Sequence, residues 1–141
     1  MITTAALATQ ESTFARAFSA GDVTLARDLY DPAVVYLSPT VRLFGWPPRI
    51  EGVERTLEFV QLTIRRCRDI TYRAVEVAVL PDAAAAFALI HFDWTTEARR
   101  VRSRYVVIYR YRGGRIAQQE LYYDPDGTLE ELGPCDGTAS K

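Results

Sequence analysis

One segment constrains the fold of this chain more than any other: residues 99–125, which read RRVRSRYVVIYRYRGGRIAQQELYYDP. In its first half, arginines occupy most even positions, and most odd positions are apolar or aromatic, which is the period of a half-buried β-strand. Gly113-Gly114 then supplies the positive φ values that a tight hairpin turn needs. The segment therefore predicts a long hairpin with strands at Arg99–Arg112 and Arg115–Tyr123, and with the odd face of the first strand buried.

Helical patterns precede the strands. Residues 5–20 carry apolar side chains at helical spacing and end at Gly21, and Asp22 is a suitable cap for a short second helix over Val23–Tyr30. A third helix is indicated by apolar residues that repeat in steps of three and four, namely Val53, Leu57, Val60, Ile64 and Cys67. Trp46-Pro47-Pro48 predicts a loop before that helix, because two adjacent prolines do not fit a helix interior.

Shorter strands are expected at residues 34–37, 70–80 and 83–95, with a turn at Pro81-Asp82. Helices first and an antiparallel meander afterwards indicate an α+β domain. We expect three N-terminal helices packed against one strongly curved, mostly antiparallel sheet that encloses a pocket. Residues 1–125 are predicted to form this domain, and residues 126–141 a weakly ordered tail.

Composition narrows the functional classes. A chain of 141 residues with 48% hydrophobic side chains suits one domain with a real core. A net charge of −1 argues against electrostatic binding to nucleic acid or to anionic membrane, and no apolar run is long enough to cross a bilayer. The first residues lack the pattern of a secretory signal, and Cys67 and Cys135 are expected to be free thiols, so a cytoplasmic protein is expected.

This arrangement resembles the NTF2-like superfamily, with its cone-shaped, cystatin-like fold, and in particular its SnoaL-like group. The residues that carry the resemblance are Ala20-Gly21-Asp22, Pro39, Ile50-Glu51-Gly52, Gly114-Arg115-Ile116 and Tyr122-Tyr123-Asp124. The similarity covers about residues 10–125, nearly the whole domain. It implies a hydrophobic pocket and the chemistry of polyketide cyclases, ketosteroid isomerases or limonene epoxide hydrolases.

The catalytic positions of the best-known members are not matched. Where a ketosteroid isomerase has its oxyanion-hole tyrosine, its general-base aspartate and its protonated aspartate, this chain has Phe14, Ser38 and Val107. The final-strand aspartate of the limonene epoxide hydrolases falls at Leu121, and no matching Arg and Asp pair is found. In place of the acid/base aspartate of SnoaL-type cyclases, the last strand offers Gln119, Glu120 and Tyr123.

The same comparison gives each strand a face toward the pocket. The residues predicted to contact a substrate are Phe14, Phe18, Ser38, Trp46, Phe59, Phe87, Leu89, Val107, Tyr109, Gln119, Leu121 and Tyr123. His91, the only histidine, is the predicted acid/base, with Asp93 on the same strand face to orient it and Tyr105 to donate to a carbonyl. The alternative is that His91 is hydrogen-bonded within the sheet, that Asp93 pairs with an arginine, and that the tyrosines are packing residues.

These residues predict an enzyme, a cyclase, isomerase or dehydratase that acts on a hydrophobic cyclic or polyketide-like small molecule by acid/base catalysis. A non-catalytic small-molecule-binding or dimeric interaction module is one alternative, and an epoxide hydrolase-like hydrolase is another. No cofactor or metal site is expected, because there is one histidine and the carboxylates are not clustered. The arginine stripe of the long strand is interpreted as a solvated sheet face. Apolar residues on that face, Ile90, Phe92, Val106 and Ile108, together with the resemblance, predict a homodimer through it.

Overall fold

The computed structural model of the chain describes residues 2–80, 84–123 and 129–134. Two α-helices and two short 3-10 helices are found there: α1 (Thr4–Ala20), η1 (Val23–Leu29), η2 (Pro39–Phe44) and α2 (Val53–Arg66). The strands are β1 (Tyr30–Leu37), β2 (Arg49–Glu51), β3 (Arg68–Val79), β4 (Ala85–Thr96), β5 (Arg99–Arg112), β6 (Arg115–Tyr122) and β7 (Glu130–Pro134). None of the helices in the described part is both long and apolar enough to cross a membrane.

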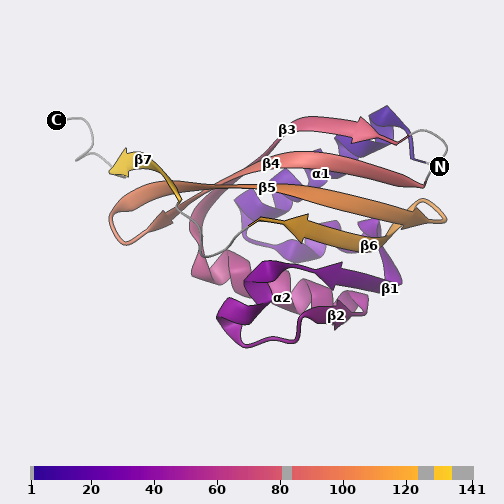
Figure 1. Cartoon of the computed structure of the whole chain (residues 1–141), viewed down its shortest axis with the longest axis horizontal. Coiled ribbons are helices and arrows are strands. Elements are labelled where there is room, and N and C mark those ends of the chain that lie inside the picture. The colour runs from indigo at the N-terminus through magenta and orange to yellow at the C-terminus, as the bar shows by residue number, and fades with distance from the viewer. Residues whose placement is uncertain (1, 81–83, 124–128, 135–141) are drawn as a thin grey trace.

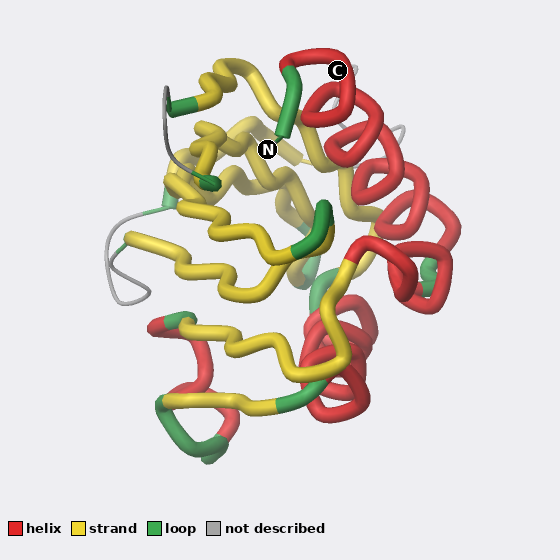
Figure 2. Tube along the Cα trace, turned by 90° about the vertical axis from the view of Figure 1, so that its right-hand side faces the viewer, coloured by secondary structure: helices red, strands yellow, loops and turns green. Residues whose placement is uncertain are grey.

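The strands form one mixed sheet in the order β2-β1-β6-β5-β4-β3, and β7 pairs with the first residues of β5 (Figure 1). Only the pair β1–β6 is parallel among the described strands, and the other pairs are antiparallel. Both α-helices lie on the same side of the sheet (Figure 2). The predicted α+β architecture, with helices packed on a mostly antiparallel sheet, is therefore confirmed, and the sheet stays open at β2 and β3.

Local sequence explains where the helices begin and end. The hydroxyl of Thr3 accepts a hydrogen bond from the backbone N–H of Ala6 at 3.0 Å and caps α1. Gly21 ends α1 with a φ of 69°, a left-handed conformation that glycine adopts without strain. Asp22 then caps η1 by accepting from the backbone N–H of Thr24. The chain thus turns sharply, and β1 follows directly after η1.

Two hairpin turns set the registers of the long strands. At the turn between β5 and β6, Gly113 and Gly114 have φ values of 59° and 82°, as the sequence predicts. At the turn between β4 and β5, Thr96 is paired with Arg99, so two residues make the turn and Glu97 has a φ of 53°. A bulge between Arg110 and Tyr111 shifts the pairing of β5 with β6.

The hydrophobic core lies between the helices and the concave face of the sheet. Phe14 of α1 is 5% exposed, and its ring lies 6.0 to 6.2 Å from the rings of Tyr30, Tyr72 and Tyr109. Burial of such aromatic side chains contributes about 2 to 3 kcal/mol each. This aromatic layer packs against α1 at Phe14, and Phe18, one turn later in the same helix, lines the cavity.

A strand lies where the sequence predicts a weakly ordered tail. β7 pairs antiparallel with Arg99–Arg102 of β5, and Glu131 forms an ion pair with Arg99 at 2.7 Å. The sequence does not predict this strand, because five residues with a glycine and a proline give no clear alternation. The predicted domain boundary at residue 125 and the predicted turn at Pro81-Asp82 lie outside the described residues, as does Cys135.

Candidate functional site

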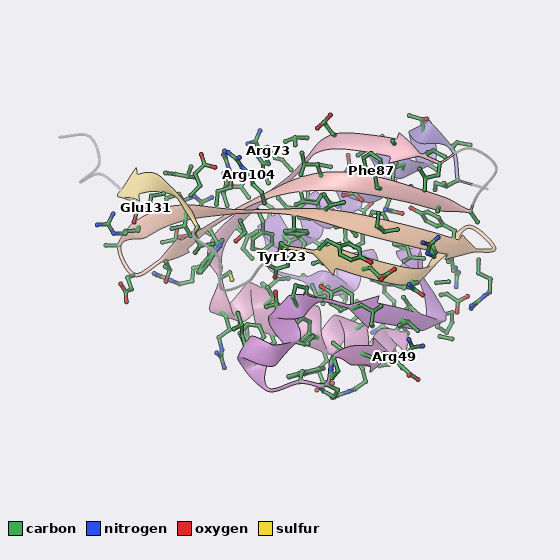
Figure 3. All side chains as sticks on the ribbon, viewed as in Figure 1. Arg49, Arg73, Phe87, Arg104, Tyr123 and Glu131 are labelled. Carbon is green, nitrogen blue, oxygen red and sulfur yellow. The ribbon has the colours of Figure 1, made fainter. Side chains whose placement is uncertain are left out.

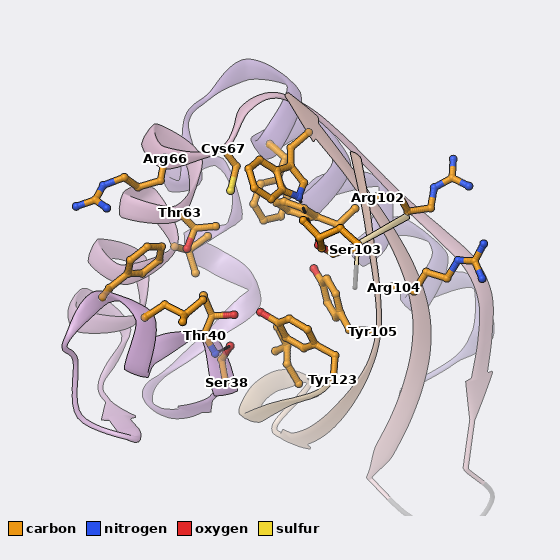
Figure 4. A pocket seen from close by; sticks show the side chains of 18 of the residues that line it. Ser38, Thr40, Thr63, Arg66, Cys67, Arg102, Ser103, Arg104, Tyr105 and Tyr123 are labelled. Carbon is orange, nitrogen blue, oxygen red and sulfur yellow. Dashed lines mark hydrogen bonds between the residues drawn. The ribbon is translucent and has the colours of Figure 1, made fainter. Parts of the chain in front are cut away.

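A cavity of about 500 Å³ lies between the concave face of the sheet and the helices. Figure 4 shows it framed by α2 on one side and by the strands on the other. Its apolar wall is formed by Phe18 of α1, Phe59 and Val60 of α2, Phe92 and Trp94 of β4, and Leu121 of β6. A cavity of this size and lining suits an apolar small molecule.

Neutral polar groups interrupt this wall. Seven hydroxyl-bearing residues line the cavity, namely Tyr36, Ser38, Thr40, Thr63, Ser103, Tyr105 and Tyr123. They come from β1, η2, α2, β5 and the residue after β6, so that segments distant in sequence converge on one space. Hydroxyls in an apolar cavity favour ligands that accept or donate hydrogen bonds without carrying charge.

Three of these hydroxyls belong to tyrosines that remain protonated. Burial raises the pKa of Tyr123 to about 12, and it raises the pKa of Tyr36 and Tyr105 as well, with nearby tyrosines adding to the effect for these two. The rings of Tyr105 and Tyr123 are 5.3 Å apart between centroids. At neutral pH each side chain is therefore a hydrogen-bond donor and not a base.

The smaller hydroxyls differ in how far the protein satisfies them. Thr63 donates to the carbonyl oxygen of Phe59 at 3.3 Å, and Ser103 accepts from the indole N–H of Trp94 at 3.4 Å. Ser38 accepts from the backbone N–H of Thr40 at 3.3 Å. The Oγ1 atom of Thr40 is itself buried and has no hydrogen-bond partner in the described part of the chain.

Charged groups are confined to the rim. Arg66, Arg102 and Arg104 contribute to the lining, but Figure 4 shows their side chains extending away from the cavity. Arg104 pairs with Glu130 of β7 at 2.5 Å, and Glu130 is the only carboxylate that lines the cavity among the described residues. Burial raises the pKa of the Cys67 thiol to about 11, so this lining group is neutral too.

The predicted facing of β4 is wrong. In the antiparallel pair β4–β5, Ile90 lies opposite Tyr105 and Phe92 lies opposite Ser103, so the even residues of β4 share the concave face with the odd residues of β5. The two-residue turn between the strands forces this parity. The odd residues, which were expected in the pocket, therefore lie on the outer face: Phe87, Leu89, His91 and Asp93. Figure 3 shows Phe87 on that face with Arg73 and Arg104.

His91 and Asp93 do not form the expected catalytic pair. Asp93 accepts two hydrogen bonds from Arg102, at 2.7 and 3.0 Å, which lowers the pKa of its carboxyl. His91 lies between Arg73 and Arg104 on the neighbouring strands. Partial burial and then the charges of Arg102, Arg104 and Arg73 lower the pKa of His91, and its Nδ1 has no partner among the described residues. The alternative interpretation is thus confirmed for Asp93, and His91 is not hydrogen-bonded through Nδ1.

The other predicted site residues fall into two groups. Six line the cavity as expected: Phe18, Ser38, Phe59, Tyr105, Leu121 and Tyr123. Phe14, Val107 and Tyr109 lie in the core behind it, and buried Gln119 accepts a hydrogen bond from Tyr30 at 2.7 Å. Trp46 packs on Phe59 at 5.2 Å between centroids, with the guanidinium of Arg55 4.2 Å above its ring. Their roles in binding remain predictions.

Several lining residues were missed by sequence reasoning. Tyr36 lies on β1, two residues before Ser38, which directly follows the strand, so alternation alone would have found it. Phe92 and Trp94 follow once the parity of the hairpin is known. Thr40 lies in the short helix η2, where no periodic pattern assigns a direction to its side chain. Within the described residues no cluster of His, Cys, Asp and Glu has the geometry of a metal site.

Comparisons with known proteins agree with this geometry. A family model described as a SnoaL-like domain matches residues 12–119. Comparison with curated protein sequences finds no significant match. Among solved structures, a proposed isomerase from Bacillus subtilis is 21% identical, with a TM-score of 0.74 over 89% of this chain and 91% of that one.

Two further solved structures share the fold. The Mycobacterium tuberculosis protein RV0760c is 17% identical, with a TM-score of 0.74 over 92% of this chain and 99% of that one. A protein from Catenulispora acidiphila with a ketosteroid isomerase-like fold, solved in complex with trimethylamine, is 11% identical, with a TM-score of 0.68 over 82% and 85% of the two chains. At these identities the similarity is one of fold.

Proposed function

Because the chain belongs to the family of SnoaL-like domains, we propose that its cavity binds a neutral, ring-containing hydrophobic molecule and polarises a carbonyl group of that ligand. Tyr105 is the principal donor to this carbonyl, and the ring of Tyr123 packs beside it. The family resemblance favours isomerisation or cyclisation as the reaction, because both proceed through enol or enolate species that such donors stabilise.

The observation that carries this proposal is the contrast between the inside of the cavity and its rim. The inner surface combines aromatic rings with hydroxyls of high pKa, whereas the arginines point outward. A charged ligand would lose its hydration without gaining a partner of opposite charge there. A ketone, in contrast, loses little on transfer and gains hydrogen bonds from the tyrosines.

Binding is tested with 1-tetralone, a bicyclic ketone, by isothermal titration of the wild type, Tyr105→Phe and Tyr122→Phe. Tyr122 is 56% exposed and donates to Glu120 outside the cavity, so it serves as the matched control. We expect about a three- to tenfold weaker affinity for Tyr105→Phe, the value of one hydrogen bond, and no change for Tyr122→Phe. Equal affinities for all three proteins would refute the assigned donor.

Catalysis is tested on the same molecule by the rate at which its α-protons exchange in D₂O. Polarisation of the carbonyl accelerates enolisation, so the wild type should increase the exchange rate and Tyr105→Phe should lose most of that increase. Exchange at the uncatalysed rate, despite binding, would exclude carbonyl polarisation as the function.

A non-catalytic binding module is the second candidate function. It is favoured by the absence of an imidazole and of an inward-pointing carboxylate among the described lining residues, so that no general base for proton abstraction is evident there. Tight binding of 1-tetralone without accelerated exchange is the result expected for this candidate. The epoxide hydrolase alternative lacks support, since Asp93 and Arg102 pair with each other on the outer face.

We also propose that two copies of the chain associate through the outer face of the sheet. The described part of that face carries the apolar side chains Phe87, Leu89, Val106 and Ile108 in two adjacent cross-strand rows. The cross-strand pair His91–Arg104 lies next to these rows on one side. Glu120 of β6 is paired with Ile108 and extends the Phe87–Ile108 row. A two-fold axis through Leu89–Val106 would therefore place Arg104 of one copy near Glu120 of the other. Ile108→Lys should give a monomer in sedimentation velocity, and Val75→Lys, on β3, should not.

A further inference from the structure

Five of the seven hydroxyl-bearing residues that line the cavity form two neighbouring groups. Tyr105 and Ser103 project from β5, and Ser103 is already bonded to Trp94. Ser38 and Thr40, from the end of β1 and from η2, make the second group together with Tyr123. Figure 4 shows Ser38, Thr40 and Tyr123 at one side of the cavity and Ser103 and Tyr105 at another. A single carbonyl held by Tyr105 leaves the second group unused.

Thr40 is the residue of the second group that most clearly lacks a partner. Its Oγ1 is buried and makes no hydrogen bond within the described residues, although Thr40 lines the cavity. Its backbone N–H is satisfied by Ser38 Oγ, so the local turn uses the backbone and not the hydroxyl. Leaving a buried hydroxyl unpaired costs free energy, and such a group in a binding cavity indicates a hydrogen bond made with the ligand.

The neighbours of Thr40 support a polar contact at this place. Ser38 is 5% exposed, and its oxygen accepts a hydrogen bond from the backbone N–H of Thr40. Hydrogen bonding to Ser38 partly opposes the burial that raises the pKa of Tyr123, which places the Tyr123 hydroxyl next to the same serine. Three hydroxyl-bearing residues therefore lie at one side of the cavity, and a hydroxyl is able to donate or to accept.

We propose that Thr40, with Ser38 and Tyr123, binds a second oxygen function of the ligand, so that the substrate class is a ring ketone that also carries a hydroxyl or a second carbonyl. This inference rests on the proposed carbonyl site at Tyr105. The rings of Tyr105 and Tyr123 are 5.3 Å apart between centroids, so the two oxygen functions lie near each other on one ring system. Thr40 acts as a selectivity residue and takes no part in proton transfer.

The test compares the affinities of 1-tetralone and of its 5-, 6- and 7-hydroxy derivatives by isothermal titration. We expect at least one hydroxytetralone to bind the wild type about three- to tenfold more tightly than 1-tetralone. Thr40→Val keeps the shape of the side chain and removes the hydroxyl, so it should abolish this preference. Thr40→Ser, which restores a hydroxyl, should restore the preference.

Thr13→Val is the matched control. Thr13 of α1 does not line the cavity, and its hydroxyl donates to the helix carbonyl of Thr9 at 3.0 Å, so its removal should leave the preference intact. Equal affinities of the wild type for 1-tetralone and all three derivatives would refute the second subsite. The proposed function would still stand if Tyr105→Phe binds 1-tetralone more weakly than the wild type does. Failure of every tetralone to bind would refute both. A preference that survives in a folded Thr40→Val would refute the role of Thr40.

Discussion

The two faces of β4 and β5 differ in chemistry although they belong to the same strands. On the concave face, Phe92 packs on Phe18 of α1 and Tyr105 packs on Tyr123, the residue after β6, and the polar groups are uncharged hydroxyls. On the outer face, Asp93 and Arg102 pair with each other and leave no free carboxylate between them. The comparison teaches that the charged residues, which attract attention in the sequence, stabilise the sheet, and that neutral residues form the candidate site.

The largest expected effect distinguishes the two faces of β4 directly. Phe92→Ala removes a ring that is 6% exposed and packs on Phe18, so it should lower the free energy of unfolding by about 3 to 4 kcal/mol. Phe87→Ala, on the outer face, should cost less than half of that. Urea denaturation at two protein concentrations measures both values and separates any contribution of dimerisation. The reverse order would mean that β4 has the opposite facing.

The next largest effect on stability is expected for Asp93, the carboxylate of the outer face. Asp93→Asn weakens the paired hydrogen bonds with Arg102 and should lower stability by about 1 to 3 kcal/mol at pH 7. The pKa of Asp93 is lowered from its ordinary value of 3.8, so the folded state favours the carboxylate. The stabilisation is therefore present above pH 3.8 and is lost as the pH falls through the folded-state pKa. Denaturation from pH 6 to pH 3 should show the wild type and Asp93→Asn converging.

Glu11, a buried carboxyl on the helix side of the sheet, should show the opposite pH dependence of stability. Glu11 is 6% exposed and accepts hydrogen bonds from Tyr72 at 2.6 Å and from Gln10 at 2.9 Å, without a cation among the described residues. Burial raises the pKa of its carboxyl above the ordinary value of 4.5, so the folded state favours the protonated form. Its contribution is complete below pH 4.5 and is lost as the pH rises through the folded-state pKa.

Glu11→Gln is the variant that reveals this dependence. The stability of the wild type relative to Glu11→Gln should decrease by about 1 kcal/mol between pH 4 and pH 7, in urea denaturation at matched ionic strength. Glu54→Gln, an exposed control on α2, should show no such decrease, because the hydrogen bond from Arg27 lowers the pKa of the Glu54 carboxyl. A difference that rises with pH for Glu11→Gln would contradict the described burial of the carboxyl.

The sequence identifies the architecture well, because hairpin chemistry and helix caps are local. Gly113-Gly114 and the alternation of Arg99–Arg112 predict β5 with its observed bounds. The facing of β4 is not local in this sense. That strand is apolar on both faces, so its own residues do not show which face is buried, and the answer depends on the number of residues in the turn before Arg99.

The candidate site was only partly predictable for a related reason. The positions of Tyr105 and Tyr123 in the cavity are predicted by alternation along β5 and along β6 to the residue after it, since these strands have one clearly polar face. The unpaired hydroxyl of Thr40 arises from the packing of η2 against the cavity, and no spacing in the sequence encodes it. His91 attracted a catalytic interpretation as the only histidine, although the identity of a residue does not determine where its side chain points.

The central claim is that the neutral concave face, and not the histidine of the outer face, contacts the ligand. Titration of 1-tetralone into the wild type, Tyr105→Phe and His91→Ala at pH 7 tests it most directly. The account predicts about a three- to tenfold loss of affinity for Tyr105→Phe and an unchanged affinity for His91→Ala. A loss in His91→Ala, with Tyr105→Phe binding like the wild type, would contradict it.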